Sequence, residues 1–212
     1  MFEETIDRIA SCAIVPVIAL EREADALPLA DALVAGGLPI AEVTFRTSAA
    51  EPSIRALSKR GDMLVGAGTV LNIDTVKRAV DAGATFIVSP GFNPKVVSYC
   101  VEQKIAITPG CITPTELEMA IDHGLSVVKF FPAEQFGGLK TIKALAAPYG
   151  QMRFIPTGGI GEKQLAEYLA FKPVVAVGGS WFVAKELLAA GNLAEITRLT
   201  RAAVDVARSV RR

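Results

Sequence analysis

Short apolar runs rich in β-branched residues alternate along the whole chain with amphipathic segments rich in Ala, Leu, Glu and Lys. The pair of run and segment recurs roughly every 20–27 residues, which is typical of strand–helix units. We expect strands to begin near Ile14, Ile40, Met63, Thr85, Ile105, Ser126, Arg153 and Val174. The segments predicted to be helical are 24–35, 49–59, 73–82, 94–103, 114–122, 139–146, 163–170 and 193–208.

Eight alternating units predict a parallel sheet, and eight is the number of strands that closes a (β/α)8 TIM barrel. An open doubly wound sheet usually has about five to seven units and often a G-x-G-x-x-G turn after its first strand. This chain has neither feature, and no change of composition marks a linker, so we predict one α/β barrel domain over residues 1–212. An extra short helix is expected over 181–188. Pro16 lies in the first strand, and we expect it at the strand start or at a bulge.

The composition of the chain excludes several classes of function. Its 22 basic and 22 acidic residues cancel, which argues against binding to nucleic acid or to a membrane surface through bulk charge. No apolar run is long enough to span a bilayer, and the N-terminus lacks the pattern of a signal peptide. Cys12, Cys100 and Cys111 have no C-x-x-C spacing, which fits a reducing cytosol and neither a disulfide framework nor a zinc site. We therefore expect a cytoplasmic protein.

The chain has a single histidine, His123, just before Gly124 at a predicted helix end. One histidine leaves no histidine cluster for a divalent metal, and no Ser-His-Asp triad unless His123 belongs to it. The sequence therefore predicts chemistry without a metal or cofactor, performed by lysine, carboxylates and backbone groups.

Lys129 stands in the middle of an apolar run, 126–131, that is typical of a buried strand. Burial strips the ammonium of water and so favours the neutral amine, which is a nucleophile toward a ketone carbonyl. The alternative is a lysine paired with a buried carboxylate that performs no chemistry.

Alternation along the second predicted strand places Glu42, Thr44 and Arg46 on its inward face, in the same barrel as Lys129. Glu42 is suited to move protons, directly or through one water, and Arg46 to hold a substrate carboxylate in its planar fork. Thr69 ends the third strand with a hydroxyl and an N–H. The alternative is a Glu42–Arg46 or Glu42–Lys129 ion pair that only stabilises the fold. A buried ion pair contributes little stability, because the cost of desolvating the charges offsets their Coulomb attraction.

The last two strands are each followed by a glycine pair, Gly158-Gly159 and Gly178-Gly179, the second leading into Ser180 and the extra helix. Loops seven and eight with such a helix form the usual phosphate site of barrels, and we expect Ser180 at the helix N-cap. The two sets of residues together predict a substrate with a 2-keto acid at one end and a phosphate at the other.

Seven motifs, in order over nearly the whole chain, resemble the 2-keto-3-deoxy-6-phosphogluconate (KDPG) aldolases. They are VPVI at 15–18, EVTFRT at 42–47, GAGTVL at 66–71, SPG at 89–91, KFFPAE at 129–134, PTGGI at 156–160 and GGSW at 178–181. The resemblance implies a homotrimeric class I aldolase of the Entner–Doudoroff pathway that cleaves KDPG to pyruvate and D-glyceraldehyde 3-phosphate.

By the same resemblance, Lys129 is the Schiff-base lysine and Glu42 the proton acceptor and donor. Arg46, Thr69 and Pro90 surround the pyruvyl carboxylate, and Phe131 packs beside the imine. The resemblance assigns the phosphate to Gly158, Gly159, Gly179 and Ser180. Arg22 stands where some relatives have a basic residue that helps to bind phosphate.

Three alternatives remain open at this point. The same family includes aldolases for the galactonate epimer of the substrate and for 4-hydroxy-2-oxoglutarate. A more distant alternative is a phosphosugar-binding barrel without catalysis, in which Lys129 is merely paired with Glu42.

Overall fold

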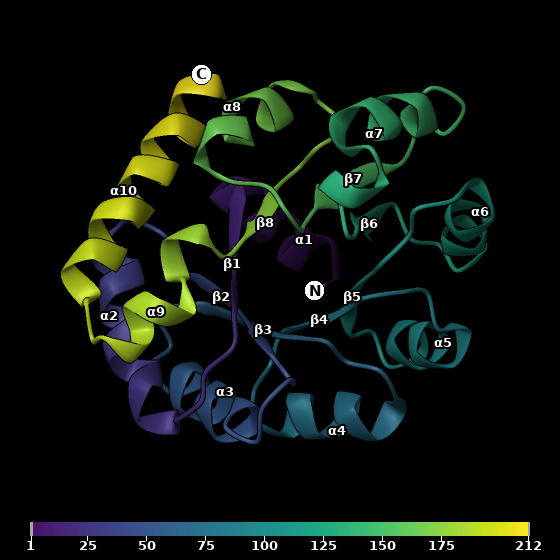
Figure 1. The fold of residues 1–212 in the computed structure, drawn as a ribbon. Helices are drawn as coiled ribbons and strands as arrows, with labels where there is room; N and C mark the ends of the chain where they lie inside the picture. Colours follow the sequence, from purple (N-terminus) through teal and green to yellow (C-terminus); the bar gives the residue numbers. More distant parts are fainter. Residues whose placement is uncertain (1, 212) are drawn as a thin grey trace.

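The computed structural model describes residues 2–211, and within them eight parallel strands form a barrel enclosed by helices (Figure 1). The expected barrel architecture is therefore confirmed. The strands are β1 (Ile14–Ile18), β2 (Ile40–Thr44), β3 (Leu64–Gly68), β4 (Phe86–Ser89), β5 (Ala106–Pro109), β6 (Val127–Phe130), β7 (Arg153–Pro156) and β8 (Val177–Gly179).

The strands pair as two ladders that isolated bridges join into a ring. One ladder has the order β5-β4-β3-β2-β1-β8 and the other is the pair β6-β7. Parallel bridges link Gly110 to Lys129 and Thr157 to Gly178, which closes the barrel on both sides of the β6-β7 pair. The Cys111 N–H strengthens the first junction by donating to the Lys129 carbonyl at 2.8 Å.

Helices between the strands form the outer layer (Figure 1). They are η1 (Glu23–Asp25), α2 (Ala26–Ala35), α3 (Ala50–Ser58), α4 (Ile73–Asp81), α5 (Pro94–Glu102), α6 (Pro114–Asp122), η2 (Glu134–Phe136), α7 (Gly138–Ala146), α8 (Glu162–Ala170) and α10 (Leu193–Val210). Several begin at side-chain caps, because the first backbone N–H groups of a helix have no partner within it. Asn72 caps α4, Asn93 caps α5, and Thr113 with Glu116 forms a capping box on α6.

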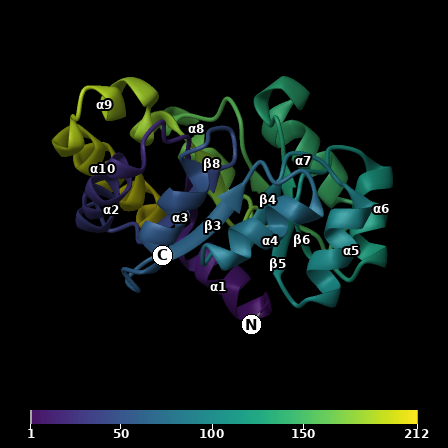
Figure 2. The same cartoon turned by 90° about the horizontal axis from the view of Figure 1, so that it is seen from below.

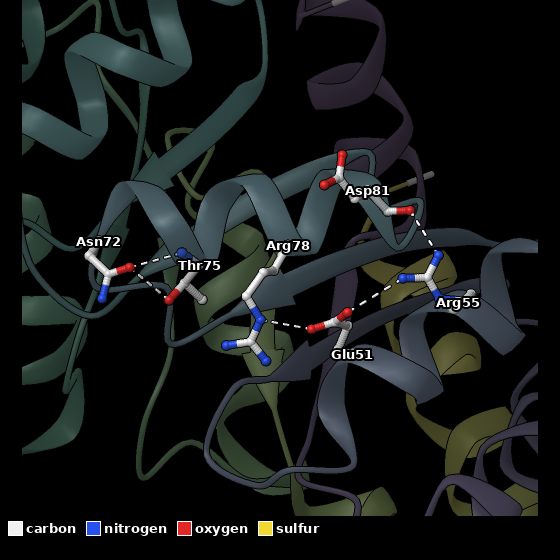
Figure 3. A network of polar contacts seen from close by, with 6 residues as sticks. All are labelled: Glu51, Arg55, Asn72, Thr75, Arg78 and Asp81. Atoms are coloured by element: carbon white, nitrogen blue, oxygen red, sulfur yellow. Dashed lines mark hydrogen bonds and ion pairs between the residues drawn. The ribbon is translucent and has the colours of Figure 1, made fainter.

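Charged side chains tie neighbouring helices together on the outside of the barrel (Figure 3). Glu51 on α3 accepts from Arg78 on α4 at 2.7 Å and from Arg55 at 3.4 Å. Arg55 also donates to the carbonyl of Asp81, at the end of α4, at 3.1 Å. This network lies far from the strands' inner face and serves the packing of α3 against α4.

An N-terminal helix that was not predicted from the sequence, α1 (Phe2–Cys12), lies at the end of the barrel away from α9 (Figure 2). Ile6 and Ile9 are each 1% exposed and bury the apolar side of this helix in the core. The signal for α1 was present, because Ile6 and Ile9 have helical spacing after an acidic first turn. No helix within residues 2–211 combines the length and the apolar character needed to cross a bilayer.

Two expected elements differ in detail. The last strand was predicted to begin near Val174, but β8 begins at Val177. Val174 forms a single parallel bridge with Phe154 ahead of this strand, and the carbonyls of Val174 and Val175 accept hydrogen bonds from the Arg211 guanidinium, at 3.2 and 2.6 Å. The helix expected over 181–188 is split into η3 (Trp181–Val183) and α9 (Lys185–Ala189).

The prediction that Pro16 marks a strand start or a bulge is wrong, because it is the third residue of β1. Residues 14–16 pair with β8, and residues 17–18 pair with β2. Pro16 thus stands where the strand changes partners. A missing N–H is tolerated at such a position better than within one continuous ladder.

Candidate active site

Two charged side chains face each other inside the barrel. Lys129 comes from β6 and Glu42 from β2, and their Nζ and Oε1 atoms are 3.3 Å apart. Lys129 is 6% exposed and Glu42 is 3% exposed. The Phe131 ring covers another side of the amine, with its centroid 5.2 Å from Nζ. The two residues that the sequence proposed for covalent and proton chemistry are therefore neighbours in a nearly dry interior.

Glycine on the next strand makes room for the Glu42 carboxylate. A Cβ atom at Gly68, the last residue of β3, would lie 2.9 Å from Cγ and 3.0 Å from Cδ of Glu42, and closer still to Oε1. Those distances are shorter than real Cβ atoms show. Because Gly68 has no side chain, the Glu42 side chain can pass beside β3 and extend toward Lys129.

Arg46 was expected on the inward face of the second strand, but β2 ends at Thr44 and Arg46 lies in the turn that follows. The Phe45 N–H donates to the Gly68 carbonyl at 2.8 Å, which fixes the start of this turn. Arg46 is exposed, and its Nε donates to the Thr44 hydroxyl at 3.0 Å. Within residues 2–211, Glu42 therefore pairs with Lys129 rather than with Arg46.

Thr69 and Pro90 follow the ends of β3 and β4, and both are half-buried. Thr69 has a φ of +57°, a left-handed conformation that is rare for a β-branched residue and that is concentrated at functional sites. A Cβ at Gly110 would overlap the backbone of Pro90, so the loops after β4 and β5 are in close contact. No polar contact links either residue to Lys129 among the described residues.

The two glycine pairs lie side by side at the ends of β7 and β8. Gly158 and Gly159 have φ values of +102° and +78°, which only glycine adopts without strain. Gly178 and Gly179 were expected to follow the last strand, but they are the last two residues of β8, and Gly178 bridges to Thr157 after β7. Ser180 precedes η3 as expected, but its exposed side chain makes no capping hydrogen bond. Its hydroxyl is therefore left for another acceptor.

Two cations lie near these loops, and each is paired with a carboxylate. Arg22 donates to both oxygens of Asp25, at 3.0 and 2.7 Å, and Lys185 on α9 donates to Glu21 at 2.8 Å. Together these four side chains line a cavity of about 220 Å³. Lys185 was not predicted from the sequence. The one indication that it lies near this site was its position five residues after Ser180.

Sequence reasoning also missed a connection that holds the loop after β6 against the loop after β7. The Tyr168 hydroxyl, from α8, donates to the Glu134 carboxylate. The Glu134 N–H donates to the Gly158 carbonyl at 3.1 Å, and the Ala133 N–H donates to the Thr157 carbonyl at 2.8 Å. Glu134 therefore links the loop that contains Phe131 to the first glycine pair.

The cysteines and the acidic side chains form no metal site in the part of the chain that the structure describes. No group of three or more His, Cys, Asp or Glu residues there is placed to hold an ion. The three cysteines are free. Burial raises the pKa of the Cys100 thiol to about 12, and the pKa of Cys111 is raised for the same main reason.

A (β/α)8 barrel with a buried lysine next to a carboxylate defines the class as an α/β barrel of the class I aldolase type. The family model for KDPG and KHG aldolases matches residues 5–199. The chain belongs to this family, and it is thus an aldolase, a lyase.

Relatives agree with this assignment over nearly full length. The chain is 49% identical to the 2-dehydro-3-deoxy-phosphogluconate aldolase of Haemophilus influenzae, over 96% of this chain and 97% of that protein. The 2-keto-3-deoxy-6-phosphogluconate aldolase of Zymomonas mobilis, solved with 3-phosphoglycerate, superposes with a TM-score of 0.90 at 40% identity, over 97% of both chains. The KDPG aldolase of Legionella pneumophila, solved with pyruvate captured as a covalent carbinolamine, gives 0.91 at 38% identity, over 94% of this chain and 97% of that one.

Proposed function

We propose that this enzyme cleaves 2-keto-3-deoxy-6-phosphogluconate to pyruvate and D-glyceraldehyde 3-phosphate through an imine on Lys129. The observation that carries the proposal is the buried pair of Lys129 and Glu42, 3.3 Å apart. Lysine is the nucleophile of aldolases that form Schiff bases, and the captured carbinolamine of the Legionella relative supports the same chemistry here.

The proposed reaction begins when the neutral Lys129 amine attacks C2 of the keto acid. The carbinolamine then takes up one proton, delivered from solvent through Glu42, and loses water to give a protonated imine. The imine draws electrons from the C3–C4 bond, which breaks as Glu42, directly or through one water, takes the proton of the C4 hydroxyl. The aldehyde leaves, and the enamine remains on Lys129. Glu42 returns its proton to C3, and water then hydrolyses the protonated imine to release pyruvate, the free amine and the proton taken up when the imine formed.

The remaining site residues bind the two ends of the substrate in this proposal. Arg46, Thr69 and Pro90 surround the carboxylate, and Phe131 packs against the imine. At the other end, the backbone N–H groups of the two glycine pairs and the Ser180 hydroxyl hold the phosphate. The phosphate-binding residues are Gly158, Gly159, Gly179 and Ser180.

Arg22 contributes to phosphate binding in this scheme only if it leaves Asp25, because that carboxylate engages its guanidinium twice. We therefore assign the phosphate mainly to backbone donors and Ser180. Glycine permits such donors to approach the oxygens closely.

Borohydride reduction in the presence of pyruvate tests the proposal. Wild-type protein should gain one reduced pyruvyl group on Lys129, located by peptide mass spectrometry. Lys129→Ala should gain none, and Lys140→Ala, which removes an exposed lysine of α7, should label like the wild type. Wild-type protein that binds pyruvate without labelling would instead favour a binding barrel without catalysis.

A second candidate substrate is 4-hydroxy-2-oxoglutarate, because the matching family model covers KHG aldolases as well. Comparing kcat/KM for KDPG, its galactonate epimer and 4-hydroxy-2-oxoglutarate ranks the three. Ser180→Ala should lower kcat/KM for the two phosphorylated substrates and spare the third, which has no phosphate. An equal loss on all three would contradict the phosphate assignment.

We further propose a single-domain homotrimer that acts in the cytoplasm, in the Entner–Doudoroff pathway, without a metal or cofactor. The resemblance supports the trimer, and three exposed apolar side chains on or beside α4 and α5 offer surface for such contacts. They are Leu71, Val80 and Val101, which are 56%, 38% and 38% exposed. Light scattering on the purified protein tests the trimer, and turnover that survives a chelator tests the independence from metal.

A further inference from the structure

Two threonine hydroxyls hold the turn that carries Arg46. Thr44, the last residue of β2, is 2% exposed and donates its hydroxyl hydrogen to the Ile18 carbonyl at 2.8 Å. Thr47 donates in the same way to the Leu20 carbonyl. Both acceptors lie at or just beyond the end of β1, so the turn is fastened to the neighbouring strand on either side of Arg46.

Only one of these hydroxyls also contacts the arginine. Arg46 Nε donates to Thr44 Oγ1 at 3.0 Å. A hydroxyl has one hydrogen and two lone pairs, and because the hydrogen of Thr44 is used on Ile18, its oxygen faces Nε as an acceptor. This arrangement engages Nε and leaves the terminal Nη groups of the guanidinium for another ligand. Within residues 2–211, Arg46 has no carboxylate partner.

We infer that Thr44 is a positioning residue that sets the orientation of the Arg46 guanidinium toward the substrate carboxylate. The inference rests on the proposed function, in which Arg46 binds that carboxylate. A guanidinium that is already held in its binding orientation loses less conformational freedom on binding than one that is free to rotate. The contact with Thr44 therefore improves the affinity of Arg46 for the substrate carboxylate. A purely structural Thr44 would instead serve only the junction of β1 and β2.

Kinetics of three Thr44 and Thr47 variants test the inference. Thr44→Val keeps the shape but removes the hydroxyl, and we expect KM for the keto acid substrate to rise about tenfold while kcat stays within about twofold. Thr44→Ser retains the hydroxyl and should behave as wild type. Thr47→Val is the matched control, because it loses a comparable bond to the β1 segment without touching Arg46, and its KM should stay near the wild-type value. An equal rise in Thr47→Val, or none in Thr44→Val, overturns the inference.

A double-mutant cycle with Arg46→Ala locates the effect. If Thr44 acts through Arg46, adding Thr44→Val to Arg46→Ala should change KM no further. Additive losses would show that Thr44 acts elsewhere and would refute the inference. Arg46→Lys gives a second route that leaves Thr44 and its bond to Ile18 intact, for the case that Thr44→Val does not fold. It keeps the charge but removes Nε, and wild-type affinity in that variant would also refute the inference.

The cycle separates failure of this inference from failure of the proposed function. If Arg46→Ala leaves the pyruvate concentration for half-maximal borohydride labelling unchanged, the proposed role of Arg46 itself is wrong. If Arg46→Ala weakens pyruvate capture and Thr44→Val does not, only the positioning role of Thr44 is wrong.

Discussion

A single methyl group at Gly68 should impair catalysis by displacing the Glu42 carboxylate. A Cβ there would lie 2.9 Å from Cγ and 3.0 Å from Cδ of Glu42. Ordinary contacts between such atoms are about 3.5–4.0 Å, so the carboxylate has to move by about 1 Å. That movement takes Oε1 away from the Lys129 amine, which it now meets at 3.3 Å.

The magnitude follows from how sensitive proton transfer is to position. A misplacement of about 1 Å costs about 100-fold in rate, so we expect Gly68→Ala to lower kcat about 100-fold. The fold should survive, since one extra methyl in a packed interior costs about 1–3 kcal/mol. For a chain of this length, that corresponds to a fall in Tm of roughly 2–10 °C.

The assay is steady-state cleavage, with thermal unfolding measured on the same samples. Gly150→Ala is the matched control, because a Cβ at Gly150 meets nothing within 4 Å and its backbone needs no positive φ. Its kcat should stay within about twofold of the wild type. Wild-type turnover in Gly68→Ala would refute the reasoning, because it would mean that the present position of Glu42 is not required.

An exposed ion pair and two buried thiols give the other predictions. Arg78 holds the pKa of Glu51 below its usual value, so this pair adds stability above about pH 4.3, which is lost as pH falls through the lower native pKa. Glu51→Gln should therefore unfold more easily by about 0.5 kcal/mol at pH 7, and the difference in unfolding free energy measured in urea should shrink as pH falls below about 4.3; a constant difference would contradict this. Because burial raises the pKa of Cys100 to about 12 and also that of Cys111, a disulfide reagent at pH 8 should modify neither until denaturant is added. Rapid reaction of both in native protein would contradict that reasoning.

Hydrophobic periodicity was sufficient to predict the barrel, because each apolar run had to be buried between its helix and the interior. Its limits lie where tertiary contacts replace strand pairing. Val174 does pair with Phe154 of β7 through a single bridge, but the strand does not continue from it, and the Arg211 guanidinium, which comes from the far end of the chain, binds the carbonyls of Val174 and Val175. No local pattern contains that information. The helix at residues 2–12 was missed for a different reason: its apolar spacing was present, but it precedes the first strand and so lies outside the strand–helix repeat.

The alternation of inward and outward side chains along a strand also predicted part of the site, but only for residues that lie within the strand. It placed Glu42 inside the barrel correctly, and the Lys129–Glu42 distance follows from barrel closure. It failed for Arg46, because β2 ends two residues earlier and alternation has no meaning in a turn. The pairing of Arg22 with Asp25 and of Lys185 with Glu21 depends on side-chain conformations at the surface. The pattern of hydrophobic residues along the sequence carries no information about these side-chain conformations.

The two-stranded segment formed by β6 and β7 is attached to its neighbours only by isolated bridges, one on the β5 side and two on the β8 side. Lys129 is itself the bridging residue on the β5 side, whereas Glu42 belongs to the six-stranded ladder. The Lys129 amine and the Glu42 carboxylate therefore come from different ladders of the barrel. Opening the barrel on either side of the β6-β7 pair should separate them even if every helix stays folded. The proposed covalent capture of pyruvate should thus report whether the barrel is closed, and it should vanish in any partly open state whose helical content still looks native.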